Sequence, residues 1–261
     1  DPGSGVMPSI ILTVRPEPDC DLDVAALARR GVPALAAPLI SPTYDTTSAR
    51  AEAELADAAS CGGVIFTSRH AVTGLLQACG GALAAGWRDL PVFAVGRSTG
   101  RAAVAAGFSD VRIGSGGGAG LVPLITASSD IFKAPLLWPA AQDRSFDMVA
   151  ALAPQASVRL VEVYSMTPVA GMPGAALEAI AERNVLAVIL MSARSARLFR
   201  DRLKSAGDLD ARRGIVVIAG SRAIADAAGQ GWRDVLVAKR PTRARLLAIA
   251  ALLYDRRDRL A

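Results

Sequence analysis

Ten short runs of apolar and β-branched residues alternate along the chain with stretches that are rich in Ala, Leu and Arg and have helical periodicity. The runs are continuously apolar, which indicates strands of a parallel sheet that helices cover on both faces. The expected strands are residues 10–14, 32–36, 63–67, 92–95, 111–113, 135–138, 158–163, 185–191, 215–219 and 234–237. The expected helices include residues 21–30, 70–79, 98–106, 193–204 and 243–254.

Part of this pattern occurs twice, at a constant spacing of 124 residues. Residues 63–68 (GVIFTS) match residues 187–192 (AVILMS), and residues 92–99 (VFAVGRST) match residues 216–223 (VVIAGSRA). Two matches at one spacing indicate an internal duplication. Two similar lobes would create a cleft between them, where a small-molecule site is usually found.

The order of the repeated segments predicts how the chain is divided. The strand-helix-strand at residues 10–36 precedes the first repeat block, whereas its counterpart at residues 135–163 follows that block. We therefore expect the chain to cross over, build the second lobe completely and return to finish the first. The sequence predicts an α/β protein of two flavodoxin-like, doubly wound parallel-sheet domains joined by a two-strand linker. The first domain is residues 7–38 and 168–261, the second is residues 42–164, and the linkers are residues 39–41 and 165–167.

Composition excludes several classes of protein. The chain has 261 residues, of which 52% are hydrophobic and 20% are charged, as is typical of a globular protein. No apolar run reaches the roughly 18 residues that a membrane span needs. Cys20, Cys61 and Cys79 lack metal-binding spacing and are odd in number, which favours a reducing cytoplasm.

The net charge of +5 is concentrated in one part of the chain, because residues 168–261 carry 17 Lys and Arg against 9 Asp and Glu. A basic region is one sign of nucleic-acid binding. This region lacks interleaved aromatic residues and any zinc-finger or RNA-binding signature, so we expect no nucleic-acid partner.

Two glycine motifs resemble known catalytic loops. Residues 96–100 (GRSTG) match the nucleophile elbow of hydrolases, but the only histidine, His70, precedes the serine instead of following it. Residues 114–120 (GSGGGAG) resemble a dinucleotide-binding loop, but their repeat counterpart at residues 238–243 is not glycine-rich. We therefore expect a flexible loop there, and no bound metal.

Four strand-to-helix turns carry the stronger signal. Their Ser, Thr and Gly residues fit ordinary helix caps. Arginine in a first turn costs about 0.3–1 kcal/mol, because the helix dipole is already positive there. Its recurrence indicates anion binding at helix N-termini, although exposed, screened arginines would also explain it. The candidate residues are Thr67, Ser68, Arg69, His70, Gly96, Arg97, Ser98, Thr99, Ser192, Ala193, Arg194, Ser195, Gly220, Ser221 and Arg222.

Three side chains at or near these turns are individual candidates for ligand contacts. His70 is either a capping or surface histidine or a contact to a ligand. Tyr164 ends an expected strand and is either an interface packing residue or a phenol directed into the cleft. Arg15 ends the first strand and is placed at the edge where a ligand would bind.

Taken together, these blocks resemble the uroporphyrinogen-III synthase family from residue 10 to about residue 253. Residues 11–18 (ILTVRPEP) are similar to its opening strand, and residues 66–72 (FTSRHAV) are similar to its Phe-Thr-Ser-x-Asn-Ala-Val, with His70 for asparagine. Residues 95–99, Val163-Tyr164 and residues 240–242 also fit. Met191 and Ala223 depart from the family, which often has a hydroxyl residue at both positions.

The resemblance implies a monomeric, cytoplasmic enzyme without a cofactor. It implies the substrate hydroxymethylbilane, an octacarboxylate that is closed to uroporphyrinogen III with ring D inverted, a lyase reaction in which Tyr164 is a candidate proton donor. The turn residues and Arg15 would then bind substrate carboxylates. The alternatives are a two-lobed anion-binding module and a non-catalytic synthase-like domain.

Overall fold

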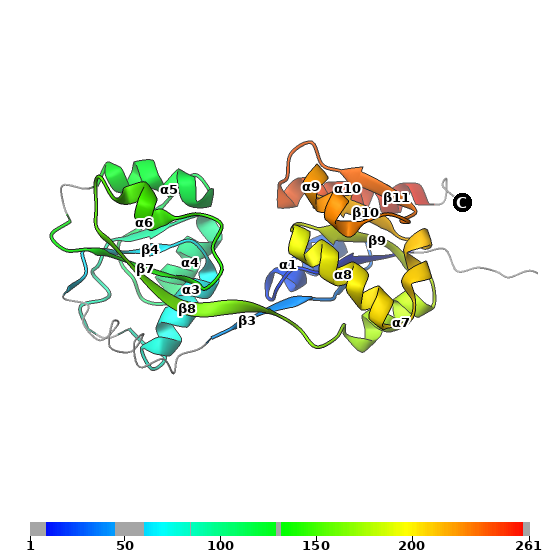
Figure 1. Cartoon of the computed structure of the whole chain (residues 1–261), viewed down its shortest axis with the longest axis horizontal. Coiled ribbons are helices and arrows are strands. Elements are labelled where there is room, and N and C mark those ends of the chain that lie inside the picture. Colours follow the sequence, from blue (N-terminus) through cyan, green and yellow to red (C-terminus); the bar gives the residue numbers. More distant parts are fainter. Residues whose placement is uncertain (1–8, 45–59, 84, 129–131, 258–261) are drawn as a thin grey trace, which may run out of the picture. The chain divides into compact units, whose positions relative to one another are not determined.

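The computed structural model describes residues 9–44, 60–83, 85–128 and 132–257. Residues 7 and 261, the outer limits of the predicted first domain, lie outside this description. The chain divides into two compact units, Asp1–Ser41 with Thr167–Ala261 (unit 1) and Pro42–Met166 (unit 2). Each unit has one sheet with helices packed on it (Figure 1).

Unit 1 contains a five-stranded sheet in the order β11-β10-β9-β1-β2, and its strand pairs are parallel. The central strands are fully apolar, and every residue of β9 and β10 is buried, as expected for strands covered on both faces. The strands are β1 Ile10–Thr13, β2 Ala34–Ala36, β9 Val185–Leu190, β10 Val216–Ala219 and β11 Asp234–Val237.

Two pairs of helices cover the unit 1 sheet. Leu27 of α1 and Leu246 and Leu247 of α10 pack against Ile11, Ile189 and Ile218 in one core cluster. On the other face α8 packs against α9, and buried Phe199 stacks on Trp232. The helices are α1 Asp19–Ala28, α7 Gly174–Ala181, α8 Ala193–Ser205, the 3-10 helix η3 Leu209–Gly214, α9 Arg222–Ala228 and α10 Arg243–Arg256.

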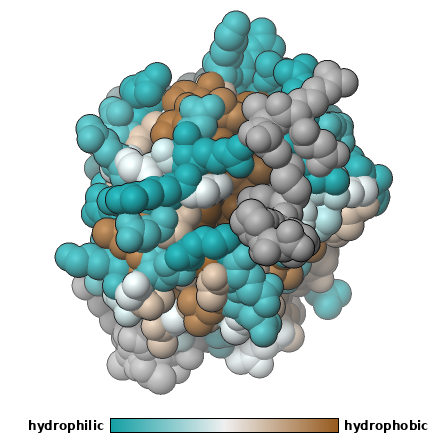
Figure 2. Space-filling model, turned by 90° about the vertical axis from the view of Figure 1, so that its right-hand side faces the viewer, coloured by the Kyte–Doolittle hydropathy of each residue, from teal (hydrophilic) through white to brown (hydrophobic). Residues whose placement is uncertain are grey.

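The surface of the molecule seen from the right of Figure 1 is largely hydrophilic, with hydrophobic residues between the polar ones (Figure 2). Such a face agrees with charged residues that lie on the solvated sides of helices. None of the helices in the described part of the chain combines the length and the apolarity that crossing a membrane requires.

Unit 2 contains a six-stranded sheet in the order β3-β8-β7-β4-β5-β6. The pairs from β8 to β6 are parallel. The strands are β3 Ile40–Thr43, β4 Gly63–Phe66, β5 Val92–Ala94, β6 Val111–Ile113, β7 Leu136–Ala141 and β8 Val158–Pro168.

Alternate residues of the unit 2 strands enter two separate cores. Val64 and Phe66 pack with α3 and α4 in one cluster, whereas Ile65 packs with α5 and α6 in another. Full burial of a side chain of this size contributes about 1.5–3 kcal/mol, so both layers of helices are held firmly on the sheet. The helices are α3 Arg69–Ala78, α4 Arg97–Ala105, α5 Gly117–Thr126 and α6 Met148–Leu152.

The predicted α/β fold with parallel sheets is confirmed, and most predicted strands and helices shift by only one or two residues at their ends. The prediction of a flexible loop at residues 114–120 is wrong, because α5 begins at Gly117. Gly116 and Gly117 have φ values of 109° and 68°, a left-handed turn that favours glycine. β7 continues to Ala141, three residues beyond its predicted end, and β8 continues to Pro168, so that residues 165–167 of the predicted two-strand linker are part of this strand.

We predict that Gly74→Ala lowers the free energy of unfolding by about 1–2 kcal/mol, because α3 lies directly on β8 at this point. A Cβ atom at Gly74 would lie 2.8 Å from both Cγ2 and the carbonyl oxygen of Val163, and such overpacking outweighs the better helix propensity of alanine. Urea unfolding measures the change. Gly174→Ala is the matched control, because its Cβ would meet no atom within 4 Å in the part of the chain that the structure describes; an equal loss there would contradict the prediction.

Candidate functional site

The turn after β4 is a capped helix N-terminus. Thr67 follows the strand, and Ser68 is the N-cap of α3, where its hydroxyl accepts a hydrogen bond of 3.1 Å from the backbone N–H of His70. Arg69 is the first residue of the helix. Since β4 follows the same direction as its neighbours, this turn lies at the carboxyl edge of the sheet, where ligands of open α/β sheets bind.

The turn after β5 lies beside it, because β4 and β5 are neighbours and α3 contacts α4. Gly96 is the N-cap of α4 with extended backbone (φ −170°), so no side chain caps this helix. A Cβ atom at Gly96 would meet no atom of the described residues within 4 Å. Arg97 and Ser98 are exposed, whereas Thr99 is buried. The turn therefore has room beside Gly96, and among the described residues no side chain caps its N–H groups.

Unit 1 has the same arrangement after β9 and β10. Ser192 is the N-cap of α8 and accepts a hydrogen bond of 3.0 Å from the N–H of Ser195, whose hydroxyl lies 3.0 Å from that of Ser192. Ser221 is the N-cap of α9 and accepts one of 3.3 Å from the N–H of Ile224. The remaining candidates of these turns are half-buried Ala193 and Arg194, buried Gly220 and exposed Arg222.

All four predicted turns are thus helix N-termini, and three of their serines act as caps. A cap satisfies only part of the N–H groups that a helix leaves without partners. The uncapped N–H groups, together with the exposed side chains of Arg97 and Arg222, can take part in binding an anion.

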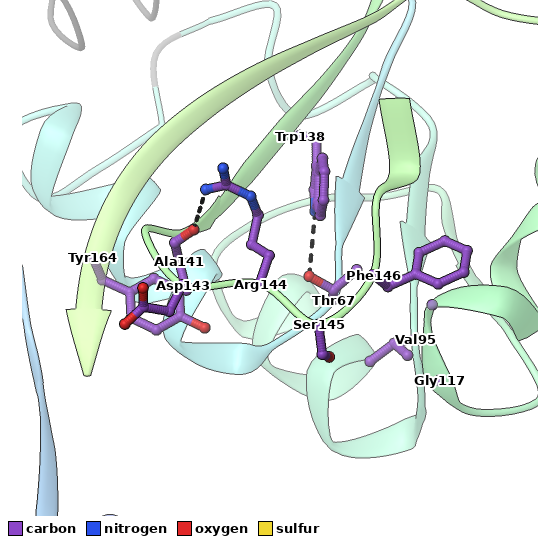
Figure 3. Close-up of a pocket in the computed structure, with 11 residues that line it drawn as sticks. Thr67, Val95, Gly117, Trp138, Ala141, Asp143, Arg144, Ser145, Phe146 and Tyr164 are labelled. Carbon is purple, nitrogen blue, oxygen red and sulfur yellow. Dashed lines mark hydrogen bonds between the residues drawn. The ribbon is translucent and has the colours of Figure 1, made fainter. Parts of the chain in front are cut away.

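A pocket of about 280 Å³ opens at the carboxyl edge of the unit 2 sheet. The indole of Trp138 donates a hydrogen bond of 3.2 Å to the Thr67 hydroxyl, as Figure 3 shows. Arg144 donates to the carbonyl oxygen of Ala141 and forms an ion pair of 2.8 Å with Glu162. The pocket is lined by Thr67, Val95, Gly117, Gly118, Trp138, Ala141, Asp143, Arg144, Ser145, Phe146 and Tyr164.

Tyr164 lies on β8, is half-buried and borders this pocket (Figure 3). Burial raises the pKa of the Tyr164 phenol above its ordinary value, and a hydrogen bond with the Ser68 side chain opposes that shift to a smaller extent. The phenol is therefore protonated at neutral pH and can act as a proton donor.

Two other rings lie beside Tyr164. Its ring centroid is 5.8 Å from that of His70 and 6.3 Å from that of Tyr44. The Tyr44 hydroxyl lies 3.3 Å from Nδ1 of His70. Burial lowers the pKa of His70, with a smaller contribution from the charge of Arg69, and burial raises the pKa of Tyr44. Both groups are therefore neutral at pH 7.

Two carboxylates engage the guanidinium of Arg15. Its guanidinium lies 2.8 Å from Asp19 and 3.3 Å from Asp23. Asp23 is 1% exposed and also pairs with Arg243 of α10. The structure thus places Arg15 at the end of β1, as predicted, but with its charge balanced by neighbouring side chains.

Sequence reasoning missed four residues of the unit 2 edge: Tyr44, Trp138, Asp143 and Arg144. We predicted that the strand of Trp138 ends at that residue, whereas β7 continues to Ala141. Asp143 and Arg144 lie in the loop that follows β7, beyond the end that the apolar pattern predicts. Tyr44 directly follows the first crossing between the units, and the strand before it pairs with the strand of Tyr164. This position in the sequence could have identified it.

Comparisons with known proteins give a matching family model and solved structures of similar fold. The sequence model described as uroporphyrinogen-III synthase HemD matches residues 22–248. A mutant uroporphyrinogen III synthase from the extremely thermophilic bacterium Thermus thermophilus has a TM-score of 0.52 and 19% identity over 97% of this chain and 99% of that chain. The uroporphyrinogen-III synthetase of Helicobacter pylori has a TM-score of 0.57 and 17% identity over 93% of this chain and 98% of that chain. No curated protein sequence matches. At these identities the likeness between structures concerns the fold.

We predict that the imidazole of His70 titrates below pH 6.5, its ordinary pKa. As the pH falls below 6.5, the unfolded chain takes up this proton first, so the free energy of unfolding decreases. NMR titration measures the pKa without ambiguity, because the chain has a single histidine. Arg69→Gln should raise this pKa but leave it below 6.5, since burial has the larger effect. A wild-type pKa at or above 6.5 would contradict the prediction.

Proposed function

This chain belongs to the uroporphyrinogen-III synthase family, and we propose that it catalyses the cyclisation of hydroxymethylbilane to uroporphyrinogen III, with inversion of ring D. The observation that carries the proposal is the match of the family model to residues 22–248, which cover most of both units. The reaction releases water and belongs to tetrapyrrole biosynthesis, so the enzyme is assigned to the cyclising hydro-lyases.

The turns at the carboxyl edges suit a substrate with many carboxylates. Each turn offers backbone N–H groups, and the helix dipole adds partial positive charge. In unit 2 we assign carboxylate binding to the turns that begin at Thr67 and Gly96. In unit 1 we assign it to the turns that begin at Ser192 and Gly220. Since Met191 and Ala223 lack hydroxyls, these unit 1 turns bind through backbone N–H groups, Arg194 and Arg222.

Arg15 receives a lesser role than the sequence suggested. Its guanidinium would have to leave Asp19 and buried Asp23 in order to bind a carboxylate, and Asp23 would then keep only Arg243. We therefore propose that Arg15 mainly holds the carboxyl end of β1 against α1.

We also propose that the two units arose by duplication of one flavodoxin-like unit. The repeat blocks contain β4 and β5 in unit 2 and β9 and β10 in unit 1, and they occupy equivalent places in the two strand orders. β7 and β8 take the places of β1 and β2. The proposed domains are residues 7–38 with 168–261 and residues 42–164, joined by residues 39–41 and 165–167. The compact units found in the structure support this division.

In the proposed reaction, Tyr164 donates its proton to the hydroxyl group of ring A, which leaves as water. The resulting azafulvene is attacked by the substituted carbon of ring D. The spiro intermediate that forms then fragments and recloses with ring D inverted. After the final closure, ring D loses a proton as it regains aromaticity, and this proton restores the Tyr164 phenol.

Uncatalysed closure gives the isomer without inversion, so the enzyme must mainly impose a conformation on the substrate. This is catalysis by positioning, and preorganised N–H groups can stabilise the charge that develops. We further propose a monomer that needs no cofactor. Within the described part of the chain, Cys20, Cys61 and Cys79 form no disulfide, which supports a cytoplasmic location.

We predict that the purified protein converts hydroxymethylbilane to uroporphyrinogen III. Chromatography of the oxidised porphyrins separates the type III isomer from the type I isomer that forms without enzyme. Type I alone would overturn the proposal and favour an anion-binding module or a non-catalytic synthase-like domain. Those two alternatives differ in whether the protein binds hydroxymethylbilane.

We predict that Tyr164→Phe lowers kcat by roughly 100-fold, as is typical for loss of a general acid, with little change in KM. Some turnover remains, because positioning does not depend on the phenol. Steady-state kinetics measures both constants. An unchanged kcat would show that the proton comes from another group.

A further inference from the structure

The strongest unassigned feature of unit 2 is the pair formed by Tyr44 and His70. We propose that Tyr44 is a positioning residue for the cyclisation: its hydroxyl donates to Nδ1 of His70, which fixes the imidazole proton on Nε2 as a donor to a substrate carboxylate. This role rests on the proposed function. The two residues come from different parts of unit 2, since Tyr44 follows β3 and His70 lies in α3.

The pair is held by the frame of the unit. Tyr44 directly follows β3, and β3 is the sheet neighbour of β8, which carries Tyr164. His70 is the second residue of α3, and its backbone N–H is fixed on Ser68. The ring contacts of 5.8 Å and 6.3 Å therefore join both side chains to Tyr164.

The direction of the hydrogen bond follows from the chemistry of the two groups. A neutral imidazole has one N–H donor and one acceptor nitrogen, and the bond at one nitrogen decides where the proton lies. Tyr44 and His70 are 3.3 Å apart at Oη and Nδ1. A phenol that keeps its proton is the stronger donor, and the imidazole nitrogen is the stronger acceptor. Nδ1 therefore accepts, and the proton lies on Nε2.

The groups around the imidazole favour the neutral form. Arg69 adds positive charge next to His70, and Tyr44, Tyr164 and Ser68 are uncharged neighbours. A neutral donor of fixed tautomer suits a carboxylate that must bind in one orientation. Loss of the Tyr44 hydroxyl would leave both tautomers accessible, and only one of them presents Nε2–H.

Nitrogen-15 NMR of the wild-type enzyme tests the tautomer directly, since its histidine signals belong to His70 alone. We expect the proton on Nε2 in the wild type and a mixture of tautomers in Tyr44→Phe. Tyr44→Phe should also lower kcat/KM for hydroxymethylbilane by roughly 3- to 10-fold, the range for one neutral hydrogen bond. Tyr254→Phe, in α10 of unit 1, is the matched control and should change neither measurement.

A double-mutant cycle tests whether Tyr44 acts through His70. In a His70→Ala background, Tyr44→Phe should change kcat/KM by less than about 2-fold. An equal loss in both backgrounds, a wild-type proton on Nδ1, or an unchanged tautomer in Tyr44→Phe would each overturn the role of Tyr44. A wild type that forms no uroporphyrinogen III overturns the proposed function and, with it, this role. The wrong tautomer in an active enzyme overturns the role of Tyr44 alone.

Discussion

The structure depends on one property of parallel α/β sheets: every helix that follows a strand begins at the same edge, with N–H groups that its own turns do not satisfy. Ser68, Ser192 and Ser221 each satisfy part of this requirement as N-caps. The groups that remain face the edge at which the strands end. An anion can complete the hydrogen bonding of such a turn, and this chain adds arginine in the first turn. The proposed binding of a substrate with many carboxylates thus relies on the way the helices begin.

Close packing turns this edge into a site in unit 2. Gly74 lets the backbone of α3 approach Val163, the residue before Tyr164, so the capped turn and the phenol belong to one rigid frame. The contact between Ser68 and Tyr164, the pair of Tyr44 with His70, and the bond from Trp138 to Thr67 all depend on this frame. None of the residues in these contacts carries a formal charge at neutral pH. The contacts that hold this frame together are therefore hydrogen bonds and ring contacts between neutral groups.

The arginines show that net charge does not measure the capacity to bind anions. Arg15 and Arg243 converge on Asp23, a nearly fully buried carboxylate that needs partners to be tolerated in the interior. Arg144 is held by Glu162 at the rim of the pocket. Arg97 and Arg222, in contrast, are exposed in the first turns of their helices. The basic composition of residues 168–261 therefore serves internal ion pairs as well as the surface.

The sequence by itself determined the layered α/β architecture, the strand-to-helix turns and their caps. Runs of apolar residues indicate which segments are buried, and small polar residues indicate where a local hydrogen bond caps a helix. It did not reveal α5 in the glycine-rich segment, because glycine signals a special backbone angle without saying which structure follows. Only the tertiary structure decided that Tyr44 meets His70 and that Asp23 neutralises Arg15. Trp138 and Thr67 are 71 residues apart, and such contacts depend on strand order and register, which no local pattern encodes.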